Sequence, residues 1–317
     1  MITPLISVIV PNYNHSKFLQ ERLDSIFAQS FQDFELIILD DASTDKSVEL
    51  IKQIISDKEN VSLIVNTQNS GSTFAQWNKG IALARGKYIW IAESDDYASA
   101  SFLSTLVPLI ENNNDCTIAY SQSNYIRNNT LGASLLDWTN DLSSTFWTKD
   151  FKIEGHEVVM KYWIHKNIII NASAALFSKA AYLQSAAKNN INYRLCGDWF
   201  TWIALMQNGN LIFKSETLNF YRRHEGTVTN KWQSNLVVKK EINEIHNFCY
   251  RYFIKDENDS KLIMQAQFNN WRSFIERFGK FKYLSQILKS NEYFEFPNKL
   301  YLVKFIPLFI IRKLYGR

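Results

Sequence analysis

The stretch from Tyr88 to Tyr97, YIWIAESDDY, joins a run of apolar residues to a cluster of acids. Residues 88–92 have the continuous apolar character of a strand that is buried on both faces. Three carboxylates follow within four residues, at Glu93, Asp95 and Asp96. Such a cluster is typical of a divalent cation site that also takes phosphate oxygens, although a solvated acidic turn would have the same sequence.

The same kind of strand recurs on the N-terminal side of this stretch, in alternation with amphipathic helical segments. The alternation predicts an α/β fold with a mostly parallel sheet and helices on both of its faces. The predicted strands are 6–11, 34–39, 61–65 and 88–92, and the predicted helices are 18–29, 45–55 and 73–84.

Beyond residue 116 the alternation becomes less regular. Short strands are predicted at 117–120, 168–170 and 211–213, with a helix at 199–207. From residue 231 onward the sequence is helical and basic in character. We therefore divide the chain into residues 1–115, 116–230 and a C-terminal helical extension over 231–317.

Polar residues follow the predicted strands, at the sheet edge where ligands of parallel sheets bind. The first strand ends in residues 11–14, PNYN, and the second in Asp40 and Asp41, which suit ribose hydroxyls or a base N–H. Ser43 and Thr44 are typical helix caps. The sequence has no glycine-rich phosphate loop, so phosphate binding is expected to depend on a metal ion, which disfavours a dinucleotide oxidoreductase.

Two further clusters lie downstream. Asp198 follows Gly197 at the predicted start of a helix that carries Trp199 and Trp202. An acid in this position is most often a helix cap, but beside aromatic residues it could also be a general base held against a sugar. The segment 221–227, YRRHEGT, follows a predicted strand, and its Arg and His side chains could hold phosphate or a metal ion.

Composition narrows the setting. The three cysteines form no CxxC pair and no signal peptide is evident, which favours the reducing cytosol. Residues 231–317 hold 16 Lys and Arg against 8 Asp and Glu, whereas the rest of the chain is acidic, which disfavours nucleic acid as a partner. Residues 300–311, LYLVKFIPLFII, are too few to span a bilayer, but with basic flanks they could lie on the inner face of the cytoplasmic membrane.

Taken together, the clusters resemble the family 2 glycosyltransferases of the GT-A fold, which are mostly bacterial, inverting enzymes of polysaccharide and cell-envelope biosynthesis. The matching segments occur in the order of the family and span about residues 5–230: ISVIVPNYN (6–14), LDDASTD (39–45), ARGKYIWIAESDDY (84–97), GDWFTW (197–202) and YRRHEGTVT (221–229).

The resemblance implies a role for each matched residue. Residues 1–115 would be the nucleotide-sugar-binding half of one domain, and 116–230 its acceptor-binding, catalytic half. Asp198 matches the general base and Asp96 the direct ligand of a divalent metal ion, Mn or Mg. His224 matches a position that helps to hold the diphosphate or the metal. The implied nucleotide-sugar-binding residues are Pro11, Tyr13, Asp40, Asp41 and Asp95.

Two departures from the family pattern concern the donor site. Glu93 stands where the family usually has the first Asp of its acidic motif. The family's glycine-to-glycine helix motif appears as residues 71–80 with one extra residue, and Trp77 stands where Arg is usual. Contacts of this helix with the donor are therefore expected to differ.

The implied reaction is the transfer of a sugar from a nucleotide diphosphate, with a UDP-sugar favoured, to a hydroxyl of a glycan or lipid-linked acceptor. Two alternatives remain. A nucleotidyltransferase also uses a parallel sheet and acidic metal ligands, but would carry a basic, glycine-rich loop near the N-terminus. A catalytically inactive, glycosyltransferase-like binding protein would be expected to have lost Asp96 or Asp198, and both are present.

Overall fold

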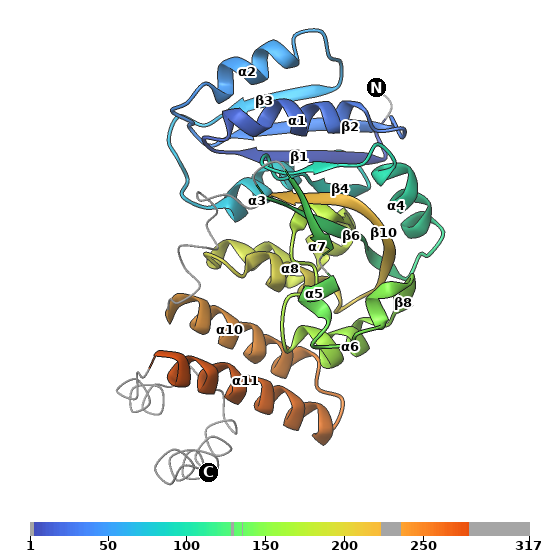
Figure 1. The fold of residues 1–317 in the computed structure, drawn as a ribbon, viewed down its shortest axis with the longest axis vertical. Coiled ribbons are helices and arrows are strands. Elements are labelled where there is room, and N and C mark those ends of the chain that lie inside the picture. The colour runs from blue at the N-terminus through green and yellow to red at the C-terminus, as the bar shows by residue number, and fades with distance from the viewer. Residues whose placement is uncertain (1–2, 128–129, 135, 223–235, 279–317) are drawn as a thin grey trace. The chain divides into compact units, whose positions relative to one another are not determined.

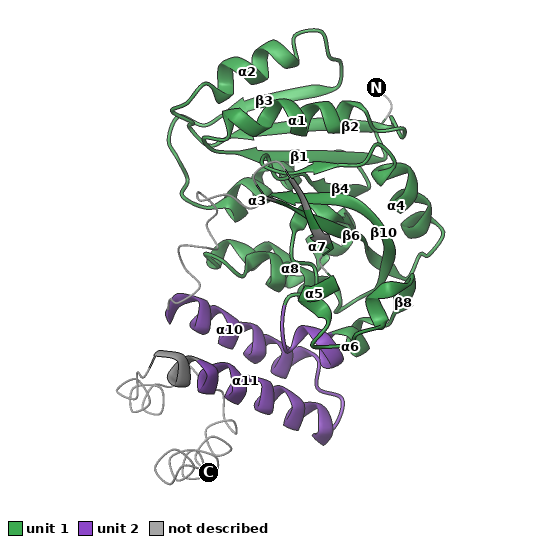
Figure 2. Cartoon of the chain, viewed as in Figure 1, with its two compact units in different colours: residues 1–158, 167–230 green, residues 159–166, 231–317 purple. Residues whose placement is uncertain are grey.

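The computed structural model of the chain describes residues 3–127, 130–134, 136–222 and 236–278. The chain divides into two compact units, shown in different colours in Figure 2. Unit 1 comprises residues 1–158 and 167–230, and unit 2 comprises residues 159–166 and 231–317.

Unit 1 is built around one sheet (Figure 1). Its strands among the described residues are β1 (Ile6–Asn12), β2 (Phe34–Asp40), β3 (Val61–Val65), β4 (Tyr88–Ile91), β5 (Tyr97–Ala98), β6 (Cys116–Arg127), β7 (Thr130–Ser134), β8 (Phe151–Ile153), β9 (Ala175–Ser178) and β10 (Asn210–Arg222). The spatial order is β3-β2-β1-β4-β9-β6-β10-β5, with β7 paired to β6 and β8 to β10. The first four strands are parallel, β10 is parallel to β6, and β9 runs antiparallel between β4 and β6.

Helices cover both faces of this sheet, because alternate residues of each strand point to opposite sides. The helices of unit 1 are α1 (Ser16–Phe27), α2 (Ser47–Ile54), α3 (Thr73–Leu83), α4 (Phe102–Glu111), α5 (Leu136–Thr139), α6 (Gly155–Val158), α7 (Lys179–Gln184) and α8 (Gly197–Leu205), with 3-10 turns η1 (Phe146–Thr148), η3 (Ala172–Ala174) and η4 (Ala186–Asn192).

The two faces can be followed from β1. Val8 and Val10 belong to a buried cluster with apolar residues of α1, α2 and α4. Ile9 points to the other side, toward α3, where a Cβ added to Gly80 would lie 2.5 Å from the Ile9 Cγ2 atom. The absent side chain at Gly80 therefore lets α3 lie close against the sheet. The predicted α/β class, with helices on both faces of a mostly parallel sheet, is confirmed.

The structure corrects three details of the sequence interpretation. Residues 168–170 form no strand; they are an irregular segment that leads into η3. The late strands β6 and β10 are much longer than the predicted 117–120 and 211–213. Helix α2 begins at Ser47 instead of residue 45, because the Asp45 carboxylate accepts the N–H groups of Ser47 and Ser16 at 2.9 and 3.0 Å.

The described part of unit 2 is helical, as predicted for the C-terminal region. It contains the π-helix η2 (Val159–Trp163), α10 (Leu236–Tyr252) and α11 (Glu257–Phe278). Side-chain hydrogen bonds join α10 to α11, such as the bond from the Gln267 Nε2 to the Asn247 Oδ1 at 2.9 Å. None of the described helices has the length and apolar character needed to cross a bilayer. The segment 300–311 lies outside the described residues.

Candidate active site

Asp40 ends β2 and organises the loop that follows it. Its side chain is fully buried and accepts hydrogen bonds from the Asn12 Nδ2 at 2.7 Å, the Ser43 N–H at 2.8 Å and the Ser43 hydroxyl at 2.7 Å. The Asn14 side chain, two residues beyond the end of β1, accepts the Thr44 N–H at 2.7 Å. These bonds join the tips of β1 and β2, where ligands of parallel sheets bind. Contact of Asp40 with a nucleotide stays a prediction.

Asp41 holds a second loop against the same tips. Its carboxylate accepts hydrogen bonds from the Asn66 Nδ2 at 2.7 Å, the Gln76 Nε2 at 2.8 Å and the Ser70 hydroxyl at 2.7 Å. The side chain is 4% exposed, so within the described residues its part is to fix the segment that leads into α3. The residues before the α1 helix differ: Pro11 is buried inside β1, whereas the Tyr13 side chain is 46% exposed at the sheet edge.

The acidic cluster lies where the sequence predicted it, directly after β4. The Trp77 Nε1 of α3 donates to the Glu93 Oε1 at 2.9 Å. The two residues that depart from the family pattern therefore contact each other. Asp95 is partly exposed, and its backbone carbonyl accepts a bond from the Arg222 Nη1 at 2.6 Å.

Asp96 points into the protein. One carboxylate oxygen accepts the Asn171 Nδ2 at 2.7 Å and the Ser173 hydroxyl at 2.8 Å, and the other accepts the Arg222 N–H at 3.0 Å. The Arg22 guanidinium lies 3.9 Å away, and the Asp96 side chain is 1% exposed. Asp96 thus joins β4 to η3 and to the end of β10.

Arg22 is the residue beneath the cluster that the sequence interpretation missed. It is fully buried, its Nε donates to the Glu93 backbone carbonyl at 2.8 Å, and its Nη2 donates to the Ser173 hydroxyl at 3.1 Å. Its Nη1 has no hydrogen-bond partner among the described residues. A signal existed: Arg22 lies on the apolar stripe of α1, between Leu19 and Leu23, where a charge is unusual.

Burial and repulsion between the carboxylates make the ionised forms of Glu93 and Asp96 less favourable. Burial, then the neighbouring Asp95 carboxylate, raises the pKa of Glu93 to about 8. The same two causes raise the pKa of Asp96 to about 6, and burial lowers the pKa of Arg22 to about 10. A site with these shifts favours an added cation, since one would stabilise the ionised acids.

The fit of a metal ion depends on which acid would bind it. Among the described residues, no group of three or more His, Cys, Asp or Glu side chains is arranged to hold a metal. An ion bound mainly through diphosphate oxygens needs only one or two carboxylates, and the partly exposed Asp95 meets that need better than the enclosed Asp96. His224 lies outside the described residues, and Arg222, expected to grip phosphate, uses its guanidinium on Asp95 and Glu21.

Asp198 is the second residue of α8, as predicted. One carboxylate oxygen accepts the Asn167 Nδ2 at 3.0 Å and the other accepts the Trp199 N–H at 2.7 Å. The side chain is partly exposed and lies in the first turn of α8. A carboxylate that is oriented by hydrogen bonds and reached by solvent has the geometry of a general base.

Gly197 fixes how α8 begins. A Cβ at this position would lie 2.6–2.8 Å from three ring carbons of the buried Phe74 in α3. We predict that Gly197→Ala lowers the free energy of unfolding by roughly 1–3 kcal/mol because the ring must move. Gly132→Ala is the matched control, since its Cβ would meet nothing closer than 3.3 Å. Thermal melts of both variants test this; equal melting temperatures would contradict it.

The segment 167–171, NIIIN, connects the two candidate centres. Asn167 at one end holds Asp198, and Asn171 at the other end holds Asp96. The carbonyl of Asn167 accepts the Trp138 Nε1 at 2.8 Å, which anchors the segment from outside. The three isoleucines led to the prediction of a strand. The two asparagines that flank them are the feature of the sequence that could have indicated a segment with polar contacts at both ends.

The strand tips and the acidic cluster lie at the edge where parallel α/β sheets bind their ligands. The chain matches the family Glycosyl transferase family 2 over residues 7–168, just over half of its length, and belongs to that family. A glycosyltransferase of Haemophilus influenzae is 43% identical over 97 residues, which cover 31% of this chain and 38% of the relative.

The putative teichuronic acid biosynthesis glycosyltransferase TuaG of Bacillus subtilis is 25% identical over 268 residues, covering 82% of this chain and 98% of TuaG. The chain spans 38–58% of the length of the first three curated relatives that it matches.

Two solved structures share the fold. Residues 1–349 of Staphylococcus aureus TarS in complex with UDP-GlcNAc superpose with a TM-score of 0.69 at 16% identity, covering 98% of this chain and 87% of the TarS chain. The mannosyltransferase PcManGT of Pyrobaculum calidifontis, in complex with GDP-Man and Mn²⁺, gives a TM-score of 0.58 at 14% identity, covering 100% and 88%. The GT-A fold expected from the sequence is confirmed.

Proposed function

We propose that this chain is an inverting glycosyltransferase that moves a sugar from a nucleotide diphosphate to a hydroxyl group of a cell-surface glycan or a lipid-linked acceptor. The observation that supports it most is the link through residues 167–171: Asn167 binds Asp198, and Asn171 binds Asp96. A general base and a leaving-group site must lie at a fixed separation for one displacement, and a five-residue segment that is hydrogen-bonded at both ends would supply it.

The reaction is a single displacement with Asp198 as base. The Asp198 carboxylate takes the proton of the acceptor hydroxyl as the hydroxyl oxygen forms a bond to the anomeric carbon. The bond from that carbon to the diphosphate breaks, and its electron pair leaves with the diphosphate. Attack opposite the leaving group inverts the configuration at the anomeric carbon.

A divalent cation, Mn or Mg, is proposed at the acidic cluster, with Asp95 as its protein ligand. When bound, it neutralises the charge that gathers on the diphosphate. Asp96 is the direct ligand expected from the sequence, but its oxygens already accept three hydrogen bonds. We therefore propose that Asp96 fixes the conformation of the acidic turn and does not bind the metal directly. The structure of PcManGT in complex with GDP-Man and Mn²⁺ supports the proposal of a divalent cation.

The proposal also covers the donor, the acceptor and the location of the enzyme. A UDP-sugar donor is favoured by the UDP-GlcNAc complex of TarS, and a cell-surface polysaccharide acceptor by TuaG. Pro11, Tyr13, Asp40 and Asp41 are proposed to surround the nucleotide within residues 1–115, with 116–230 serving the acceptor. His224 is proposed near the diphosphate. The basic region 231–317 would bring a cytoplasmic enzyme to the inner membrane surface.

Family membership favours this function over a nucleotidyltransferase. A catalytically inactive binding protein remains as the second reading, and turnover separates the two.

A thermal-shift screen of nucleotide sugars tests the donor and the metal together. We predict that a matching nucleotide sugar at 100 times its Kd stabilises the protein by about 2.7 kcal/mol, seen as a rise of several degrees in Tm, only when Mn²⁺ or Mg²⁺ is present. The metal alone and the nucleotide sugar in chelator are the controls. An equal rise in chelator would remove the metal from the proposal.

A further inference from the structure

Arg22 carries a charge at a position where a helix usually has an apolar side chain. It lies on the buried stripe of α1, and its guanidinium is 5.7 Å from the centre of the Trp90 ring. Its Nη1 has no hydrogen-bond partner among the described residues. Burying a charged group with an unmet N–H is unfavourable, so stability alone does not account for an arginine here. The contacts that Arg22 does make indicate its role.

The guanidinium holds the start of the acidic turn. Its Nε donates to the Glu93 carbonyl at 2.8 Å, and its Nη2 donates to the Ser173 hydroxyl at 3.1 Å. The Ser173 hydroxyl also accepts the Glu93 N–H at 3.0 Å and donates to the Asp96 carboxylate at 2.8 Å. A hydroxyl has one donor and two acceptor positions, so all three positions of Ser173 are used. Arg22 and Ser173 thus bind both the C=O and the N–H of Glu93.

A second arginine holds the other end of the turn. The Arg222 Nη1 donates to the Asp95 carbonyl at 2.6 Å, and the Arg222 N–H donates to the Asp96 carboxylate at 3.0 Å. The Arg222 guanidinium is packed 4.8 Å from the centre of the Phe18 ring. Because the carbonyls of Glu93 and Asp95 are both bound, the backbone between them is fixed. The Asp95 side chain is left partly exposed.

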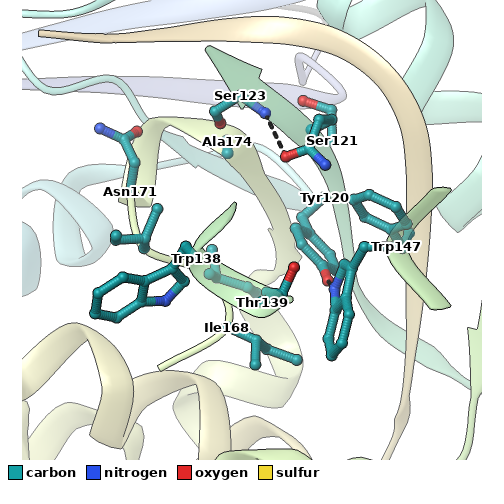
Figure 3. Close-up of a pocket in the computed structure, with 13 residues that line it drawn as sticks. Tyr120, Ser121, Ser123, Trp138, Thr139, Trp147, Ile168, Asn171 and Ala174 are labelled. Carbon is teal, nitrogen blue, oxygen red and sulfur yellow. Dashed lines mark hydrogen bonds between the residues drawn. The ribbon is translucent and has the colours of Figure 1, made fainter. Parts of the chain in front are cut away.

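The remaining side of this network adds hydrogen bonds but no charge. Asn171, which binds Asp96, lies at the wall of a small pocket against β6 (Figure 3). The residues that line this pocket are all uncharged. The Asn219 Nδ2 donates to the Asn171 Oδ1 at 3.1 Å and so orients the amide that binds Asp96. Within the described residues, the positive charge paired with Asp96 is that of Arg22, 3.9 Å away.

We propose that Arg22 is a positioning residue for the acidic turn: it holds the Glu93 carbonyl so that the Asp95 carboxylate is presented to the divalent cation. The inference rests on the proposed function, of which the cation is a part. Arg22 would affect a bound cation in two opposite ways. Its positive charge repels the cation, whereas its hydrogen bonds fix the conformation of the turn that binds it. In this turn the second effect is the larger.

Mn²⁺ affinity and thermal melts of Arg22→Met and Arg22→Lys test this role. Arg22→Met removes the charge and the hydrogen bonds, and we expect it to bind Mn²⁺ at least about tenfold more weakly, as when a residue that orients a metal ligand is lost. If only the charge mattered, Mn²⁺ would bind this variant more tightly. Arg22→Lys keeps the charge but not the planar fork, and is also expected to lose affinity. It keeps a cation beside Asp96, so it serves as the test if Arg22→Met does not fold.

Arg85→Met is the matched control. The Arg85 Nε donates to the Glu35 carboxylate at 2.8 Å. Glu35 is at the start of β2, whereas the acidic turn follows the end of the parallel strand β4, so the two lie at opposite edges of the sheet. This variant also loses a positive charge and a hydrogen bond, and we expect it to bind Mn²⁺ like the unchanged protein.

Four results would overturn the role of Arg22. They are equal or tighter Mn²⁺ binding by Arg22→Met, full affinity in Arg22→Lys, an equal loss in Arg85→Met, and no binding of Mn²⁺ by the unchanged protein. Sugar transfer by the unchanged protein, assayed with the nucleotide sugar that the thermal-shift screen selects, reports on the proposed function separately. Transfer together with any of the four results would remove the positioning role and leave the glycosyltransferase.

Discussion

Asp198→Asn is expected to lower the rate of sugar transfer by about 10²–10⁴-fold, the usual contribution of a general base. The amide cannot take the proton of the acceptor hydroxyl, so attack on the anomeric carbon slows. The nucleotide sugar would bind as before, because the strand tips and the acidic cluster are unchanged. Initial rates with saturating donor, together with donor affinity from thermal shift, measure the two effects.

The structural cost of this substitution is small and can be separated from the loss of activity. One oxygen of Asp198 accepts the Asn167 Nδ2 and the other accepts the Trp199 N–H. In Asp198→Asn the new NH2 group would face one of these two donors, and that hydrogen bond would be lost. We expect a loss of about 1 kcal/mol in the free energy of unfolding. Near-normal turnover by a well-folded Asp198→Asn protein would exclude Asp198 as the base.

Asn167→Ala distinguishes orientation of the base from its chemistry. This variant keeps the carboxylate but removes the bond that orients it, so it should lose far less activity than Asp198→Asn. Formate or azide would be expected to restore part of the activity to Asp198→Ala, where space is left for a small base, and to leave Asn167→Ala unchanged. If Asn167→Ala lost as much transfer activity as Asp198→Asn, the loss would be attributed to disturbed folding around α8 and not to the chemistry of the base.

The N-terminal half of the fold could be predicted from sequence because each element there has a single periodicity. Residues 61–65 form the strand that was expected, and residues 88–91 form β4. The apolar run 168–170 gave a wrong strand, since a short apolar run can equally be a buried connection. Its isoleucines face a pocket instead of a neighbouring strand.

The site was harder to predict than the fold. Beyond the end of a strand, the direction of each side chain depends on the conformation of the turn and no longer alternates from residue to residue. Strand alternation ends with Ile91, and the Asp96 N–H then donates to the Glu93 carbonyl at 3.2 Å in a tight turn. The geometry of this turn, which strand alternation does not predict, makes Asp96 point inward and leaves Asp95 partly exposed. Arg22 and Asn171, which meet Asp96, lie 74 and 75 residues away in the sequence.

Asp95→Asn and Asp96→Asn are expected to fail in different ways. Asp95→Asn should lower transfer by at least about 100-fold, since the proposed metal loses its protein ligand, while the melting temperature changes little. Asp96→Asn should lower the free energy of unfolding by about 1–3 kcal/mol. Its amide would face donors from Asn171, Ser173 and the Arg222 backbone, and Arg22 would lose a buried partner.

Mn²⁺ affinity and thermal melts, both measured at pH 8, decide between the two acids. At this pH Asp96 is ionised, because its pKa of about 6 lies well below. Each variant changes one carboxylate to the isosteric amide at neighbouring positions, so each is the control for the other. If Asp96→Asn melts like the unchanged protein and yet binds no Mn²⁺, the direct ligand is Asp96. If Asp95→Asn alone loses Mn²⁺, the buried acid acts by holding the turn in place.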